Sequence, residues 1–204
     1  MIKNIIFDLG NVLVNVEYER FINRLKLNGV SDENYMSFFK GGNYRLLGYE
    51  SGDISTEEFI TKCLAGLNLN MERNEYAEAF NDMFSEIKTM SSLVRKLKDE
   101  GRYDLFLLSN TSPLHFEYIK EKYSYVNLLD KFALSYELRS LKPDDIIYQR
   151  TIEHLEIEPS ESLFIDDLKE NCDAAEKHGI RTICYDKSNH AAFEKEFKNL
   201  TADS

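Results

Sequence analysis

The chain has 204 residues, of which 43% are hydrophobic and 12% aromatic, which is enough apolar material for a packed core and too much for a disordered chain. Its 36 acidic residues outnumber its 25 basic residues, and the formal net charge of −11 disfavours nucleic acid and anionic membrane surfaces as partners. The three cysteines form no Cys-x-x-Cys pair, so zinc and dithiol chemistry lack support, and we expect buried free thiols.

Neither a membrane span nor a signal peptide is expected. No apolar run approaches the roughly 20 residues needed to cross a bilayer. The apolar run at the start of the chain is interrupted by Asp8, which is too early for a signal peptide. These patterns predict a cytoplasmic protein, and they do not decide between a monomer and a homodimer.

Short apolar runs alternate with helical patterns along the chain. Runs that are apolar on both faces are typical of parallel strands that helices cover on both sides. We predict five such strands, at residues 5–9, 105–108, 132–134, 163–165 and 180–185. Amphipathic patterns that end in glycine predict helices over residues 91–101 and 168–179, and Pro143 is expected in the first turn of another helix. The alternation predicts an α/β fold, a Rossmann-like doubly wound parallel sheet.

The segment after the first strand has a different pattern, with helical periodicity and no convincing strand. Helices are expected at residues 17–27, 32–39, 56–64 and 72–84. Ser55 and Glu58 form a capping-box pattern at the start of the third helix, and we expect Gly52, Ile54 and Phe59 around it to be structural.

This pattern predicts two domains. Residues 1–14 and 89–204 are expected to form the α/β core, and residues 15–88 are expected to form an inserted all-helical cap. Hinges near residues 14–16 and 88–91 would let the cap close over the core, exclude water and select the substrate.

Polar residues stand at the ends of three predicted strands, and a lysine precedes a predicted helix. In an open parallel sheet the carboxyl ends of the strands meet at one edge, where ligands bind. Carboxylates gathered at such an edge repel one another, and a hard cation such as Mg²⁺ relieves that repulsion. The residues are Asp8, Ser109, Asn110, Lys142, Asp166 and Asp167.

The order of these residues resembles the four motifs of the haloacid dehalogenase superfamily, in the subfamily with a helical cap after the first strand. The segments FDLGNVLV, LLSNTSPLH, LKPD and LFIDDLKEN are similar, more closely, to the branch of alpha-D-glucose-1-phosphate phosphatase-like proteins. The resemblance covers essentially the whole chain. It implies a Mg²⁺-dependent phosphatase of small phosphorylated metabolites, with sugar phosphates such as glucose 1-phosphate among the candidates.

The resemblance also implies a role for each residue. Asp8 matches the nucleophile that forms an aspartyl-phosphate, and Lys142 matches the lysine that stabilises its charge. The implied metal ligands are Asp8, the backbone carbonyl of Gly10, Asp166 and Asp167. The implied substrate contacts are Ser109, Asn110, Lys142 and Asp166.

Gly10 departs from the usual pattern of the superfamily. Most of its phosphatases have an aspartate there, which acts as general acid and base, a contribution typically worth 10²–10⁴-fold in rate. His115, Asn15 or a water molecule could replace it, and the sequence does not choose among them. For His115 we favour a structural or gating role.

Three other interpretations remain beside the phosphatase. Gly10 motivates a catalytically weak or inactive member that binds a phosphometabolite without turnover. A metal-free 2-haloacid dehalogenase is disfavoured because adjacent carboxylates would repel a carboxylate substrate, and a receiver domain is disfavoured because it lacks such an insertion. In the cap, Tyr44 and Arg45 could reach a substrate, although surface or packing roles are favoured.

Overall fold

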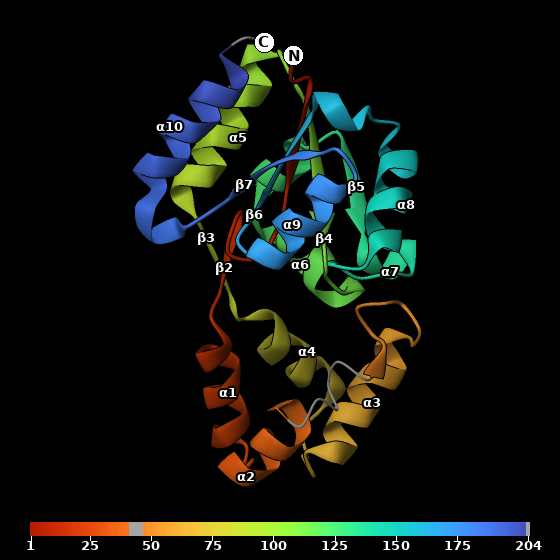
Figure 1. Cartoon of the computed structure of the whole chain (residues 1–204). Helices are drawn as coiled ribbons and strands as arrows, with labels where there is room; N and C mark the ends of the chain where they lie inside the picture. The colour runs from red at the N-terminus through yellow and green to blue at the C-terminus, as the bar shows by residue number, and fades with distance from the viewer. Residues whose placement is uncertain (41–46, 203–204) are drawn as a thin grey trace.

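A computed structural model describes residues 1–40 and 47–202 of the chain (Figure 1). Tyr44 and Arg45, for which surface or packing roles are favoured over contact with a substrate, lie outside the described residues. Within the described part of the chain, no helix combines the length and the apolar character that crossing a membrane requires.

The core of the molecule is a five-stranded parallel sheet in the order β5-β4-β1-β6-β7. The central strand β1 pairs on one side with β4 and on the other with β6, so that Ile6 lies between Phe106 and Phe164. All five predicted strands are present, and the predicted Rossmann-like α/β fold is confirmed. Their bounds are β1 (Asn4–Phe7), β4 (Asp104–Ser109), β5 (Lys131–Leu134), β6 (Ser162–Asp166) and β7 (Arg181–Cys184).

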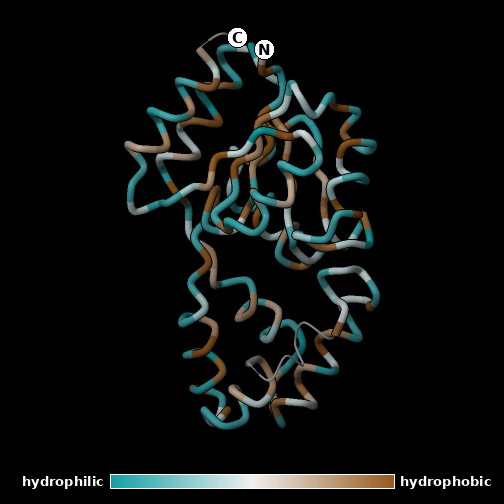
Figure 2. Tube along the Cα trace, in the orientation of Figure 1, coloured by the Kyte–Doolittle hydropathy of each residue, from teal (hydrophilic) through white to brown (hydrophobic). Residues whose placement is uncertain are grey.

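Helices cover both faces of the sheet. On one face, Ile5 and Phe7 belong to the cluster that includes α5 (Lys88–Glu100), α6 (Pro113–Lys122) and α10 (His190–Thr201). On the other face, Ile6 packs with α8 (Asp145–Leu155) and α9 (Lys169–Lys177). Figure 2 shows the apolar strands enclosed between helices of mixed polarity, which is the two-sided burial that the apolar runs predicted.

Short elements complete the core. They are η3 (Ser124–Leu128), α7 (Ser135–Leu138), η4 (Pro159–Glu161) and η5 (Lys187–Asn189).

Two details of the predicted core are wrong. Pro143 is not in the first turn of α8, because Asp144 has extended backbone angles and is the N-cap, so the helix begins at Asp145. Cys63 and Cys172 are buried as expected, but Cys184 is exposed. Cys184 is the last residue of the edge strand β7, where Ile183 faces the core and its neighbour points away.

The inserted segment forms a group of helices below the core in Figure 1. Ser55 accepts a hydrogen bond from the backbone N–H of Glu58 (3.2 Å), and the Glu58 carboxylate accepts one from Ser55 N–H (3.0 Å), which confirms the capping box. Aromatic edge-to-face contacts such as Phe21–Phe80, with ring centroids 5.3 Å apart, hold the helices together. The helices are α1 (Tyr18–Leu27), α2 (Asp32–Tyr35), η1 (Met36–Lys40), α3 (Thr56–Gly66) and α4 (Arg73–Asn81).

The prediction that this segment contains no strand is wrong. An antiparallel pair, β2 (Val14–Val16) and β3 (Phe84–Glu86), joins the helices to the core near the predicted hinges. The helix expected to reach residue 84 therefore ends at Asn81. The side chains of Asn15 and Ser85 are joined by a 3.1 Å hydrogen bond across the pair.

A loop from the cap rests on the core just before α3. The Ser135 hydroxyl donates to the backbone carbonyl of Glu50 (2.6 Å), and Arg139 donates to the carbonyl of Gly52. Gly52 has a φ of 76°, and a β-carbon there would lie 2.2 Å from the carbonyl oxygen of Tyr136. Only glycine fits this approach, in agreement with the structural role expected for Gly52.

Candidate active site

The ends of three neighbouring strands bring the predicted residues together. Asp8 follows β1 directly, Ser109 ends β4, and Asp166 ends β6. Because these strands are parallel and adjacent, their carboxyl ends share one edge of the sheet. Carboxylate oxygens of Asp8, Asp166 and Asp167 lie within 4.8 Å of one another. The sheet thus gathers the carboxylates as the sequence predicted.

Lys142 lies buried between two of these carboxylates. Its Nζ is 2.8 Å from Oδ1 of Asp8 and 2.6 Å from Oδ2 of Asp166, and it also donates to the carbonyl of Leu108 (3.1 Å). Only 2% of the side chain is exposed. Asn110 holds the backbone of Lys142 with two hydrogen bonds. Its Oδ1 accepts from Lys142 N–H (2.8 Å), and its Nδ2 donates to the Lys142 carbonyl (2.9 Å).

Asp166 is the most enclosed of the three carboxylates, with no exposed side-chain surface. Besides Lys142, its oxygens accept hydrogen bonds from Leu168 N–H (2.8 Å) and from Nδ2 of Asn171 (2.9 and 3.1 Å). Asn171 was not among the predicted site residues, although an asparagine in the first turn of the helix after an acidic pair is a local signal for such a contact. These contacts hold Asp166 in place and, through it, Lys142.

The crowding of charge perturbs the titration of the site. Burial raises the pKa of Asp8 to about 7; Lys142 opposes this shift and Asp166 adds to it. Burial and Asp166 likewise raise the pKa of Asp167. Burial works against the charge of Lys142, but its two carboxylate partners raise its pKa above the usual value. Three carboxylates facing one ammonium leave an excess of negative charge that a cation can neutralise.

The donor set fits a hard divalent cation. Asp8, Gly10 and Asp167 all line one cavity of about 360 Å³ at this edge, and Asp167 is only half-buried. Carboxylate and carbonyl oxygens are the ligands that Mg²⁺ prefers, and it keeps other positions for water and phosphate. Tyr49 and Glu50 from the loop before α3 also line this cavity.

Ser109 and His115 line a second, neighbouring cavity. The ring of His115 stacks on Phe80 with centroids 3.9 Å apart, and burial lowers its pKa to about 3. A histidine that stays neutral near pH 7 is a poor general acid. The Asn15 side chain, the other candidate, is hydrogen-bonded to Ser85 and Lys187. The surroundings of His115 and of Asn15 therefore do not suit a proton donor to the leaving group.

Known proteins resemble this chain over most of its length. Residues 2–179 match the family of haloacid dehalogenase-like hydrolases. The chain belongs to this family. It is 31% identical over 193 residues to a D-ribitol-5-phosphate phosphatase of Bacteroides thetaiotaomicron. The aligned residues cover 90% of this chain and 91% of the relative.

Solved structures of the family share the fold over nearly the full length. A HAD family enzyme of Bacteroides thetaiotaomicron superposes with a TM-score of 0.84 at 29% identity, covering 93% of this chain and 98% of the other. The same enzyme in complex with magnesium and inorganic phosphate gives a TM-score of 0.79, at 29% identity and 92% and 96% coverage. A predicted HAD-like hydrolase of Porphyromonas gingivalis gives 0.79, at 31% identity and 97% and 98% coverage.

Proposed function

We propose that this haloacid dehalogenase-like hydrolase is a Mg²⁺-dependent phosphatase of small phosphate monoesters that works through an aspartyl-phosphate on Asp8. The observation that carries the proposal is the group of carboxylates within 4.8 Å of one another, beside the buried Lys142 and open to a cavity. The phosphatase name of a relative and the magnesium and phosphate in a similar solved structure support it.

Asp8, Asp167 and the carbonyl of Gly10 would hold the Mg²⁺, and Asp166 would add its charge to the site while positioning Lys142. Bound Mg²⁺ supplies positive charge for the phosphoryl oxygens and lowers the cost of bringing an anionic substrate to three carboxylates. The carboxylates of Asp8 and Asp167 line the cavity and are accessible to an ion. The carboxylate oxygens of Asp166 instead accept hydrogen bonds from Lys142, Leu168 and Asn171.

The reaction has two displacements at phosphorus. A carboxylate oxygen of Asp8 attacks in line, the new O–P bond forms, and the bond between phosphorus and the alcohol oxygen breaks. Lys142, 2.8 Å from Asp8, balances the charge, and Ser109 with the remaining Nδ2 hydrogen of Asn110 donates to phosphoryl oxygens. Water then attacks the same phosphorus, which releases phosphate and restores the Asp8 carboxylate.

The leaving oxygen takes its proton from water in this proposal, since Gly10 has no side chain and His115 is neutral. For the alcohol half of the ester, the sequence resemblance favours sugar phosphates such as glucose 1-phosphate. An anomeric oxygen needs little protonation to leave, which suits a site without the usual acid. The name of the Bacteroides relative supports a polyol phosphate.

Hydrolysis of p-nitrophenyl phosphate by the purified protein tests the proposal. We expect phosphate release in the presence of Mg²⁺, loss of the activity with EDTA and recovery when Mg²⁺ is restored. An EDTA-insensitive rate would contradict the metal-dependent mechanism. Halide release from 2-chloropropionate would instead support the dehalogenase, and ester binding without turnover would support the inactive binding protein.

A further inference from the structure

A second cavity, of about 470 Å³, adjoins the one that contains Asp8. Several residues line both cavities, so the two spaces adjoin one another. The shared residues are Gly10, Val16, Tyr18, Glu50 and Asn110. A substrate whose phosphoryl group reaches Asp8 can therefore extend its alcohol into the second cavity.

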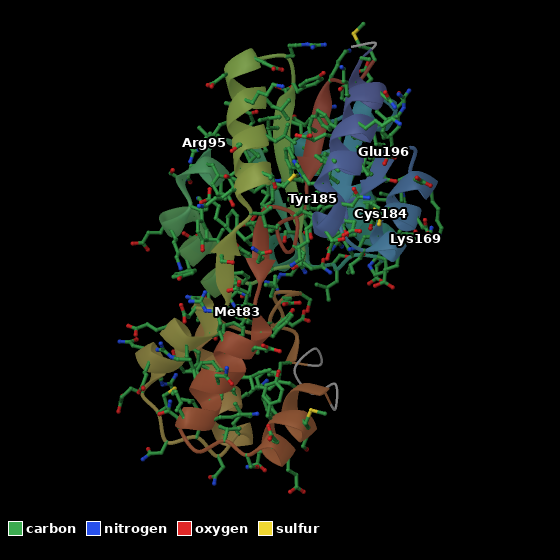
Figure 3. All side chains as sticks on the ribbon, turned by 90° about the vertical axis from the view of Figure 1, so that its left-hand side faces the viewer. Met83, Arg95, Lys169, Cys184, Tyr185 and Glu196 are labelled. Atoms are coloured by element: carbon green, nitrogen blue, oxygen red, sulfur yellow. The ribbon has the colours of Figure 1, made fainter. Side chains whose placement is uncertain are left out.

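The second cavity is lined mainly by apolar side chains from both the cap and the core. Met83 lies at the junction between the two, where Figure 3 labels it. Edge-to-face contacts between Phe21 and both Phe39 (5.8 Å) and Phe80 (5.3 Å) fix the rings in place. The apolar lining residues include Leu9, Phe21, Phe39, Phe80, Met83 and Phe84.

Most polar groups of the cavity lie toward its phosphate end, since Tyr18, Glu50 and Asn110 line both cavities; the hydroxyl of Tyr35 is a further polar group in the lining. Ser109, Asn110 and Thr111 gather where the two cavities meet the strand end. Deeper in the lining, His115 is enclosed by Phe80 (3.9 Å) and Phe84 (4.8 Å), and its Nε2 has no hydrogen-bond partner among the described residues. The low pKa of this imidazole reports the same weakly polar surroundings.

This lining discriminates against polyhydroxy substrates. Each sugar hydroxyl that enters must give up its hydrogen bonds to water, and such a loss is unfavourable unless the site replaces them. An apolar group has no hydrogen bonds to lose, and burying it is favourable in proportion to its area. An aromatic ring gains further contacts with the fixed rings of the wall.

The resemblance and the name of the Bacteroides relative favour sugar or polyol phosphates, but the lining of this cavity does not; we propose that the protein instead hydrolyses phosphate monoesters of apolar, ring-bearing alcohols in preference to them. The inference rests on the proposed phosphatase function, because Asp8 must hold the phosphoryl group for the alcohol to occupy the second cavity. It assigns the substrate's alcohol to a space lined by α1, η1, α4 and β3 of the cap and by α6 of the core.

A pair of esters of equal size tests this preference. 3-Phenylpropyl phosphate and D-ribitol 5-phosphate are both primary alkyl esters, so their intrinsic reactivities are similar. We expect kcat/KM for the phenylpropyl ester to be about tenfold higher or more, measured as phosphate release with Mg²⁺. Equal values, or a higher value for the polyol ester, would overturn the inference and leave the phosphatase function intact.

Binding to the Asp8→Asn variant makes the test independent of turnover. Calorimetry with the same two esters should give a Kd roughly tenfold lower for the phenylpropyl ester. A protein that binds this ester preferentially but hydrolyses neither would refute the phosphatase function and support the apolar site. Equal or reversed affinities would refute the apolar site.

Phe39→Ser locates the effect in the cavity. Phe39 is only half-buried in η1, and its loss should raise KM for the phenylpropyl ester about tenfold while KM for the polyol ester changes less than about twofold. Leu27→Ser, at a residue on α1 that is 85% exposed, is the control and should change neither. A Phe39→Ser variant that weakens both esters equally would indicate a structural role and overturn the assignment.

Discussion

The two adjoining cavities differ in almost every physical respect. The one at the strand ends is built around a buried lysine with two carboxylates at 2.8 and 2.6 Å, and its polar atoms are held by paired hydrogen bonds. The cavity between the cap and the core is lined by aromatic rings in edge-to-face contact. The first can stabilise charge on a phosphoryl group, and the second can select an alcohol. Changes in the first should therefore affect every ester, whereas changes in the second should affect the choice among esters.

The largest effect is expected at Asp8. Asp8→Asn removes the nucleophile, so kcat should fall on the order of 10⁴-fold or more for all esters. Asp173→Asn, at an exposed carboxylate on α9 that pairs with Lys169, is the matched control and should keep full activity. Phosphate release and circular dichroism of both variants check the prediction. Substantial turnover by Asp8→Asn would refute the proposed nucleophile.

Lys142→Met should reduce both activity and stability. It leaves Asp8 and Asp166 buried without their partner, at an expected cost of about 3–5 kcal/mol in the free energy of unfolding. The loss of the positive charge should lower kcat about 10²–10³-fold.

The control is Lys169→Met, which removes the exposed pair with Asp173 and should cost less than about 1 kcal/mol. Urea unfolding and phosphatase assays at neutral pH measure both quantities. Equal stability losses in the two variants would show that Lys142 is not the centre of a buried ion cluster.

His115→Phe should change how stability depends on pH. The native pKa is about 3, below the ordinary 6.5, so on acidification below pH 6.5 the unfolded chain takes up a proton that the native chain does not. The free energy of unfolding therefore falls with decreasing pH, by about 2 kcal/mol at pH 5 from this group. His115→Phe should remove that part of the fall.

Urea unfolding at pH 7 and pH 5 measures the difference between the wild type and the variant. Leu27→Phe, at an exposed residue of α1 that is not titratable, is the control and should leave the pH dependence as it is. If His115→Phe has the same pH dependence as the wild type, the imidazole is not held neutral by the cavity wall.

Gly52→Ala should lower stability without affecting the choice among esters. Both Gly52 and Gly29 have positive φ, at 76° and 89°, but a β-carbon at Gly29 meets nothing within 4 Å, whereas one at Gly52 meets Tyr136. Gly29→Ala should cost about 1 kcal/mol from backbone strain alone, and Gly52→Ala about 1–2 kcal/mol more. Thermal unfolding compares the two; equal costs would show that the cap loop does not press on Tyr136.

The sequence predicted the strand-end site better than the cap. Asp8 and Asp166 follow continuous apolar runs, and parallel pairing brings such strand ends together whatever the details of packing. Local patterns do not reveal β2 and β3, because each is three residues long and its partner lies far along the chain. The exposure of Cys184 depends on its position at the end of an edge strand.

The aromatic cavity was equally hidden from the sequence. Phe21, Phe39, Phe80 and Phe84 come from four different elements, and only tertiary packing makes them one surface. Asn171 is an intermediate case, because its place five residues after Asp166 is a local signal, whereas its contact with Asp166 depends on how α9 begins after β6. Residues whose roles arise from contacts between distant elements leave no local pattern to read.

A crystal structure with Mg²⁺ and a tetrahedral phosphate mimic tests the central claim most directly. We predict one ion bound by Asp8, Asp167 and the carbonyl of Gly10, with the anion against Lys142 and Asn110. An ion-free gap between Asp8 and Asp167, with the mimic bound elsewhere, would contradict the proposed phosphatase.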